Sequence, residues 1–245
     1  MAERMNKMME NNITTKIETC YGDKAYETIQ ELADGADSGD MLAAYYLAQY
    51  YEEGAVVPQD FCKAAELYMR VSECRDPLVF ADPYMPLTPQ CEAEYAIGCL
   101  YENGLLLNSS MEKAIHWFLL GAKDGGADAC FKMAEIYLAG KHTEKDYELA
   151  LKYLCDGYYC NFGHNNEKVF QLAMQLDGKT EYNRITILEI ISNCYARGIG
   201  VEQDIEQAAV YCEKANQLHE TNAKVWEELA DVKINGDLGC DELPF

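Results

Sequence analysis

The fold of this chain is decided by the segment CYARGIGVEQD, residues 194–204, and by the residues that follow it. Within the segment Tyr195 precedes Gly198 by three residues, and Ala208 follows that glycine by ten. The same spacing occurs three more times, at Tyr51/Gly54/Ala64, Tyr101/Gly104/Ala114 and Tyr137/Gly140/Ala150. An aromatic residue follows each alanine within four positions. A pattern kept at constant spacing indicates an internal repeat.

Each copy of the repeat has the features of a helical hairpin. Apolar residues recur with a period near 3.6 before each glycine, and a glycine in the left-handed conformation commonly ends a helix. The alanine in the second helix lets two helices approach closely, and the aromatic residue after it fills the space between hairpins. Asp60 and Asp204 are suited to cap second helices, and Ser109 with Glu112 is predicted to form a capping box.

This pattern resembles the Sel1-like repeat family, whose members are relatives of the tetratricopeptide repeat. The best match is the segment quoted above with Ala208 and Tyr211, and the Gly-Ala-x-Ala sequence at 126–129 resembles the family's junction between units. The resemblance implies an all-α fold, a right-handed α/α solenoid of helical hairpins with half-repeats as caps. We place the hairpins at approximately 40–71, 91–125, 127–157 and 184–217 in a single domain over residues 1–245.

Two insertions and two caps complete the predicted domain. The insertion at 72–90 is rich in proline and apolar residues and is expected to fold back on the solenoid, and the one at 158–183 contains a helical run at 167–176. The caps cover 1–38 and 218–245. Residues 23–29 resemble a second helix without its first, and residues 222–235 a first helix without its second. Such half-units are expected because an uncapped solenoid end exposes apolar faces.

The chain is strongly acidic. It has 42 Asp and Glu against 20 Lys and Arg, which gives a formal net charge of −22. This charge argues against nucleic acid or an anionic membrane as the partner, because both are polyanions. No apolar run approaches the roughly 18 residues of a membrane span, and residues 1–7 lack an apolar signal core. We therefore expect a cytoplasmic protein.

The sequence also favours reduced cysteines and predicts no catalytic chemistry. The 11 cysteines are odd in number and irregularly spaced, and most occupy apolar helix positions, where a thiol packs as a small hydrophobe. None of the four histidines has a second ligand at a metal-binding spacing, and the sequence contains no P-loop, dinucleotide-binding loop or nucleophile elbow. We predict that the chain is not an enzyme and has no cofactor and no metal site.

A partner is expected on the concave surface, which first helices line in such solenoids. Counting back from each closing glycine, positions −8 and −5 lie on the variable side, and positions −1 and −2 edge it. The predicted partner-binding residues are Tyr46, Gln49, Glu53, Glu102, Lys132, Glu135, Asn193, Arg197, Glu228 and Asp231. This mostly acidic stripe suits a protein or peptide rich in Lys and Arg, and an ordinary solvated face is the alternative for any single residue.

The leading functional hypothesis is therefore a non-catalytic scaffold for protein–protein interaction. One alternative is an inhibitor or immunity-type protein that masks the basic surface of an enzyme such as a nuclease. Another is a hydrolase acting on β-lactams, as the resemblance suggests for some secreted Sel1-like proteins; it would need regular cysteine pairs and an export signal, and neither is visible.

Overall fold

The computed structural model describes residues 16–21, 24–74, 89–160, 165–180 and 183–234, with side chains only from residue 27 to residue 225 of these ranges. The chain divides into two compact units, Met1–Phe162 and Gly163–Phe245, called unit 1 and unit 2 below. The single domain over 1–245 stays a prediction, and each unit is described by itself. Most of the predicted insertion at 72–90 falls on residues 75–88, outside the described ranges.

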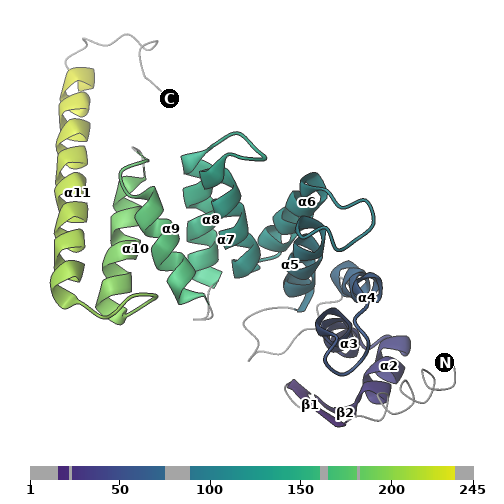
Figure 1. Cartoon of the computed structure of the whole chain (residues 1–245). Coiled ribbons are helices and arrows are strands. Elements are labelled where there is room, and N and C mark those ends of the chain that lie inside the picture. The colour runs from purple at the N-terminus through teal and green to yellow at the C-terminus, as the bar shows by residue number, and fades with distance from the viewer. Residues whose placement is uncertain (1–15, 22–23, 75–88, 161–164, 181–182, 235–245) are drawn as a thin grey trace, which may run out of the picture. The chain divides into compact units, whose positions relative to one another are not determined.

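Unit 1 contains three helical hairpins (Figure 1). Helix α3 (Met41–Glu53) packs on α4 (Phe61–Glu73), α5 (Pro89–Glu102) on α6 (Met111–Lys123), and α7 (Ala127–Ala139) on α8 (Tyr147–Cys160). Successive hairpins contact each other through α4 against α5 and through α6 against α7. Each hairpin agrees within a few residues with a predicted one, so the predicted α/α solenoid of hairpins is confirmed.

The turns of the hairpins form as the sequence predicts. The repeat glycines adopt left-handed backbone conformations, with φ of 69° at Gly54, 61° at Gly140 and 70° at Gly198. The helix after each of these turns begins at an aspartate whose carboxylate accepts a hydrogen bond from a backbone N–H. The Lys63 N–H donates to Asp60 Oδ1 over 3.0 Å, and the Gln207 N–H donates to Asp204 Oδ1 over 2.9 Å. Both predicted caps are confirmed.

The cap of α6 differs from the prediction by one residue. Ser110, not Ser109, is the N-cap, and its hydroxyl accepts from the Lys113 N–H over 3.3 Å. Ser109 instead closes the preceding loop, where its hydroxyl donates to the Leu106 carbonyl over 2.7 Å. Two adjacent serines offer the same capping chemistry, and the loop geometry decides which of them caps the helix.

Close contact between small residues and aromatic rings holds the hairpins together. Gly98 of α5 faces the Phe118 ring of α6, and a Cβ at Gly98 would lie 2.4 Å from a ring atom. Gly157 of α8 faces the Phe131 ring of α7 in the same way, at 2.6 Å. Both rings are fully buried, as is the repeat alanine Ala114. Both contacts lie within a hairpin, whereas the sequence predicted that the aromatic residues after the repeat alanines fill the space between hairpins.

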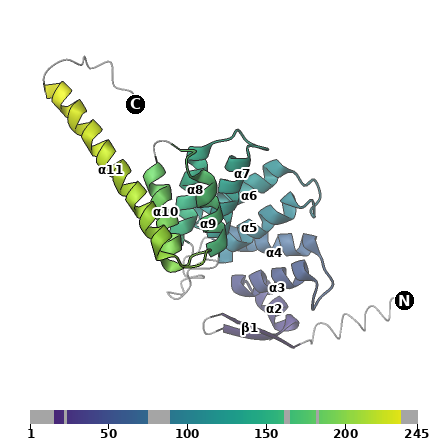
Figure 2. The same ribbon diagram turned by 60° about the vertical axis from the view of Figure 1, so that its left-hand side comes forward.

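The start of unit 1 differs from the predicted half-repeat. Strand β1 (Lys16–Tyr21) pairs antiparallel with β2 (Lys24–Thr28), and α2 (Ile29–Asp37) follows and packs on α3 (Figure 2). The prediction of a helix over residues 23–29 is therefore wrong. The Thr28 hydroxyl accepts from the Glu31 N–H in a capping box, which fixes the helix start at the end of the strand.

Unit 2 contains α9 (Asn166–Leu176), α10 (Arg184–Arg197) and α11 (Ile205–Ile234). Helix α9 confirms the helical run predicted inside the second insertion, and α10 with α11 forms the fourth hairpin. Helix α11 runs for 30 residues without a break, so the separate cap helix predicted over 222–235 is wrong. Residues 205–234 contain neither glycine nor proline, so nothing in this stretch ends the helix.

Replacing Gly98 by alanine is expected to destabilise the chain. The new Cβ would overlap the Phe118 ring, which costs about 1–3 kcal/mol of unfolding free energy, although alanine otherwise favours a helix. Urea unfolding of Gly98→Ala, Phe118→Leu and the double variant measures the coupling. The smaller leucine side chain should tolerate the new Cβ, so the double variant should lose less stability than the two single losses combined. Additive losses would contradict the proposed contact.

Burial should also make some cysteine thiols react more slowly than others. Cys130 and Cys194 are buried, and burial raises the pKa of the Cys130 thiol to about 12 and that of Cys194 to about 11. Cys62 and Cys212 are exposed. At pH 8 a maleimide should modify Cys62 and Cys212 quickly and Cys130 and Cys194 slowly, because the thiolate is the reactive species. Peptide mapping by mass spectrometry reads the rates, with a urea-unfolded sample as the control. Equal native rates would refute this assignment.

Candidate functional site

The first helices of the three hairpins in unit 1 line a partly open hollow of about 390 Å³, called the inner groove below. Helix α3 contributes Tyr45 and Gln49, and α5 contributes residues 91, 92, 95 and 96. The third wall is the start of α7, residues 126–129. The groove therefore lies where the first helices of three consecutive repeats meet.

One side of the groove carries a chain of hydrogen bonds between α3 and α5. The Gln49 amide donates from Nε2 to Tyr45 Oη over 3.0 Å, and the Tyr45 hydroxyl donates to Glu92 Oε2 over 2.5 Å. Only 8% of Tyr45 is exposed. Burial first, and then the charge of Glu92, raise the pKa of the Tyr45 phenol far above its usual value, so the phenol stays protonated and remains a donor.

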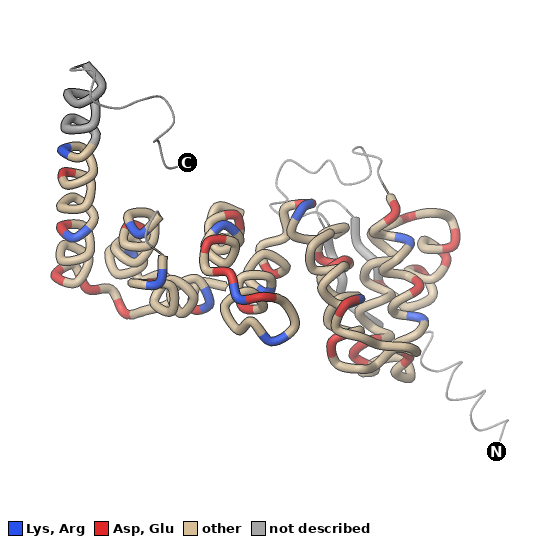
Figure 3. The backbone as a smooth tube through the Cα atoms, turned by 90° about the horizontal axis from the view of Figure 1, so that it is seen from above, with Lys and Arg blue, Asp and Glu red and all other residues tan. Residues whose placement is uncertain are grey.

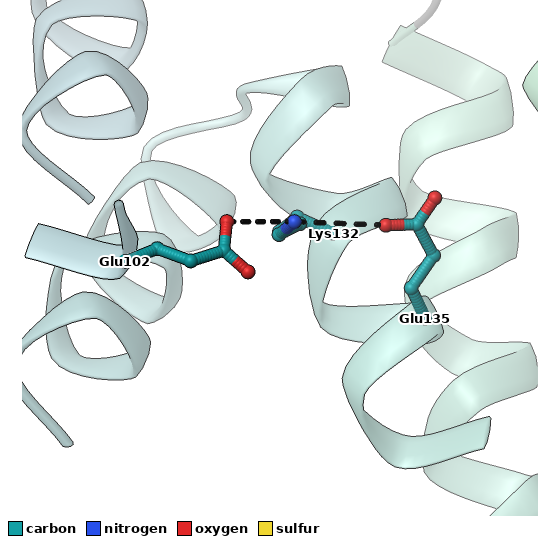
Figure 4. Close-up of polar contacts among 3 residues, drawn as sticks. All are labelled: Glu102, Lys132 and Glu135. Carbon is teal, nitrogen blue, oxygen red and sulfur yellow. Dashed lines mark ion pairs between the residues drawn. The ribbon is translucent and has the colours of Figure 1, made fainter. Parts of the chain in front are cut away.

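An ion-pair cluster links α5 to α7. Lys132 Nζ of α7 lies 2.7 Å from Glu102 Oε2 of α5 and 4.0 Å from Glu135 Oε2 (Figure 4). The Lys132 side chain is 21% exposed and that of Glu102 27%. Lys132 Nζ also lies 5.8 Å from the centre of the Phe118 ring. Lys132 therefore ties α5 to α7, and its charge is already matched by carboxylates of this chain.

The structure brings together part of the predicted site. Gln49 lines the inner groove, and Tyr46 is half-buried with its ring 5.7 Å from that of Tyr45. Glu53 is exposed in the last turn of α3. Together with the ion-pair cluster, these predicted residues all lie on first helices of unit 1.

The remaining predicted residues belong to unit 2. Asn193 and Arg197 are exposed on α10. Glu228 and Asp231 lie within α11, and their side chains fall outside the described residues. The partner-binding role of these four residues stays a prediction.

Two carboxylates and two tyrosines of the groove are absent from the predicted partner-binding residues. Glu92 and Asp128 both lie 12 positions before the closing glycine of their helix. This position, −12, is one helical turn before position −8 of the predicted binding stripe. Tyr45 and Tyr95 lie at position −9. Residues four apart share a helix face, so the same count extended by one turn finds both carboxylates.

The first helices of unit 1 are predominantly acidic, and the surface that they form is called the groove face below. These helices carry the carboxylates of Glu53, Glu92, Glu102, Asp128 and Glu135 and the amine of Lys132, and of these residues Glu92 and Asp128 line the groove. Figure 3 shows the acidic and basic positions along the described residues. Within the described residues no group of three or more histidine, cysteine or acidic side chains is arranged to hold a metal ion. In the same part of the chain, no helix combines the length and apolarity needed to cross a membrane.

The comparison with solved structures found proteins of low sequence identity. A Sel1 repeat protein from Oxalobacter formigenes is 17% identical, with a TM-score of 0.46 over 77% of this chain and 78% of that one. The protective antigen c5321 of uropathogenic Escherichia coli, with an SLR fold, is 22% identical, with a TM-score of 0.45 over 76% of this chain and 40% of that one. The immunity protein Pa5087 of Pseudomonas aeruginosa is 14% identical, with a TM-score of 0.28 over 87% and 81%.

A curated relative matches a short part of the sequence. The uncharacterized protein NMB1327 of Neisseria meningitidis serogroup B is 43% identical over 47 residues, which cover 19% of this chain and 10% of that protein. The chain therefore spans a small part of the length of this relative.

The family comparison covers far more of the chain. The model of the Sel1 repeat matches residues 42–70, 91–126, 127–155 and 191–219. These matches fall on the four hairpins of the structure and together make up half of the sequence. On this agreement between sequence and fold, the chain belongs to the Sel1 repeat family.

Proposed function

We propose that this chain is a non-catalytic scaffold that binds a protein or peptide with a basic surface along the inner face of unit 1. Sel1 repeat proteins bind proteins and are generally scaffolds without catalysis. The observation that carries the proposal is the inner groove, a hollow lined by three consecutive first helices with Glu92 and Asp128 in its wall.

The charge of the groove face supports a basic partner. The lysine on this face, Lys132, lies within ion-pair distance of Glu102 and Glu135, so its own charge does not repel an approaching cation strongly. A net charge of −22 on the whole chain adds a long-range attraction for cationic surfaces. Such complementary fields raise the association rate and fix the orientation of a partner.

The fixed shape of the groove supports binding of an extended or protruding segment. The Tyr45–Glu92 hydrogen bond links α3 to α5, and the Lys132–Glu102 ion pair links α5 to α7. These cross-links between repeats hold the walls in place before a partner arrives, which lowers the entropy lost on binding. Tyr46, Gln49, Glu53, Glu102, Lys132 and Glu135 are the contact residues that we propose in unit 1, and Asn193, Arg197, Glu228 and Asp231 those in unit 2.

Panning a random peptide library on the full chain tests this function. The recovered peptides should be enriched in Lys and Arg, and their affinity should fall as the salt concentration rises, because salt screens exposed charges. A first-helix variant with Glu53→Gln, Glu102→Gln and Glu135→Gln, residues of α3, α5 and α7, should bind such a peptide about tenfold more weakly. Calorimetry of one recovered peptide measures the change.

The matched control removes the same number of negative charges from second helices. Glu66→Gln, Glu73→Gln and Asp156→Asn change exposed residues of α4 and α8. This control should bind the peptide almost as the unaltered chain does, because its substitutions leave the first helices unchanged. An equal loss in both triple variants, or recovered peptides with no excess of basic residues, would overturn the proposal.

A further inference from the structure

We propose that the inner groove is a pocket for a single arginine side chain of the partner. This inference rests on the proposed function and makes it more specific, because it names the group that enters the hollow. A volume of about 390 Å³ is at the small end of the range of ligand pockets, roughly 300–1,000 Å³. It suits one long side chain rather than a folded segment.

Two carboxylates face the pocket from different helices. Glu92 belongs to the first turn of α5 and Asp128 to the first turn of α7, and both line the hollow. The Tyr45 hydroxyl donates to Glu92 and so fixes the orientation of that carboxylate. A carboxylate oxygen has more than one lone pair, so the oxygen that accepts from Tyr45 can accept a further hydrogen bond.

The rest of the lining favours a planar cation with an aliphatic stem. Tyr95 lines the pocket, and its ring lies 5.7 Å from the buried Phe118 ring. Ala96 of α5 is half-buried and lines the hollow, whereas Ala127 and Ala129 of α7 are buried in its wall. An arginine could place its methylene groups along Ala96 and its guanidinium beside the carboxylates and the tyrosine ring. Guanidinium combines five donors with a flat face that stacks on aromatic rings, whereas the ammonium of lysine is a point charge.

Methyl NMR of the full chain tests the pocket directly. With ¹³C-labelled alanine methyl groups, N-acetyl-arginine N-methylamide should shift the signals of the lining residues Ala96 and Ala127 in a saturable way. The citrulline analogue has the same shape without the charge, and it should bind at least about tenfold more weakly. The lysine analogue should fall in between. Equal binding of citrulline would overturn the role of charge, and equal binding of lysine would overturn the choice of arginine.

Two conservative variants locate the bound cation. Glu92→Gln keeps an acceptor for the Tyr45 hydroxyl, and Asp128→Asn keeps the size of the side chain. Each variant should nevertheless weaken binding of the arginine probe about tenfold. Glu66→Gln on α4 is the control and should leave the titration unchanged. Thermal melting of each variant, followed by circular dichroism, identifies any loss of binding that is caused by unfolding. An unchanged affinity in the folded Glu92→Gln, Asp128→Asn double variant would refute the pocket.

The pocket and the broader function can fail separately. If panned basic peptides bind the groove face but replacing their arginines by citrulline has no effect, the arginine pocket is wrong and the scaffold stands. If the arginine probe binds but panning recovers no basic peptides, the pocket stands and the proposed partner class is wrong.

Discussion

The close approach of paired helices is the constraint on which the rest of this structure depends. Glycine and alanine occupy the positions where a larger side chain would keep the two helices apart. Aromatic rings from the neighbouring helix fill the space beside these small residues. Gly98 against Phe118 and Gly157 against Phe131 show this contact within two successive hairpins. Dense packing of this kind leaves little tolerance for added volume. The spacing of small and aromatic residues therefore sets the spacing of the helices.

This packing also explains where the candidate site lies. The face of a first helix that packs on its hairpin partner is buried and apolar. The face that points toward the next first helix can carry polar groups. On α3, α5 and α7 that second face carries Gln49, Glu92, Glu102, Asp128 and Lys132. Polar contacts across it link one repeat to the next. The same residues thus order the surface and give it a chemical character suited to recognition.

The local parts of the fold were predictable from the sequence, and the parts that depend on distant partners were not. A glycine that needs a left-handed backbone and an aspartate that caps a helix act within a few residues, so Gly54, Gly140 and Asp60 could be assigned from the pattern alone. Strand β2 instead requires hydrogen bonds from β1, and a short segment with helical spacing does not reveal that partner. The carboxylates of Glu92 and Asp128 are close to the same hollow because three helices meet there, which a count along one helix shows only in part.

The length of α11 has a consequence for the repeat array itself. At 1.5 Å per residue its 30 residues extend for about 45 Å, whereas the 14 residues of α10 extend for about 21 Å. The second helix of the fourth hairpin thus continues past the length over which its partner can pair with it. A further hairpin stacked in the usual way would need a turn near residue 217, and no glycine or proline is present there to form one. Helix α11 therefore departs from the regular repeat, whose second helices in unit 1 span 13 or 14 residues.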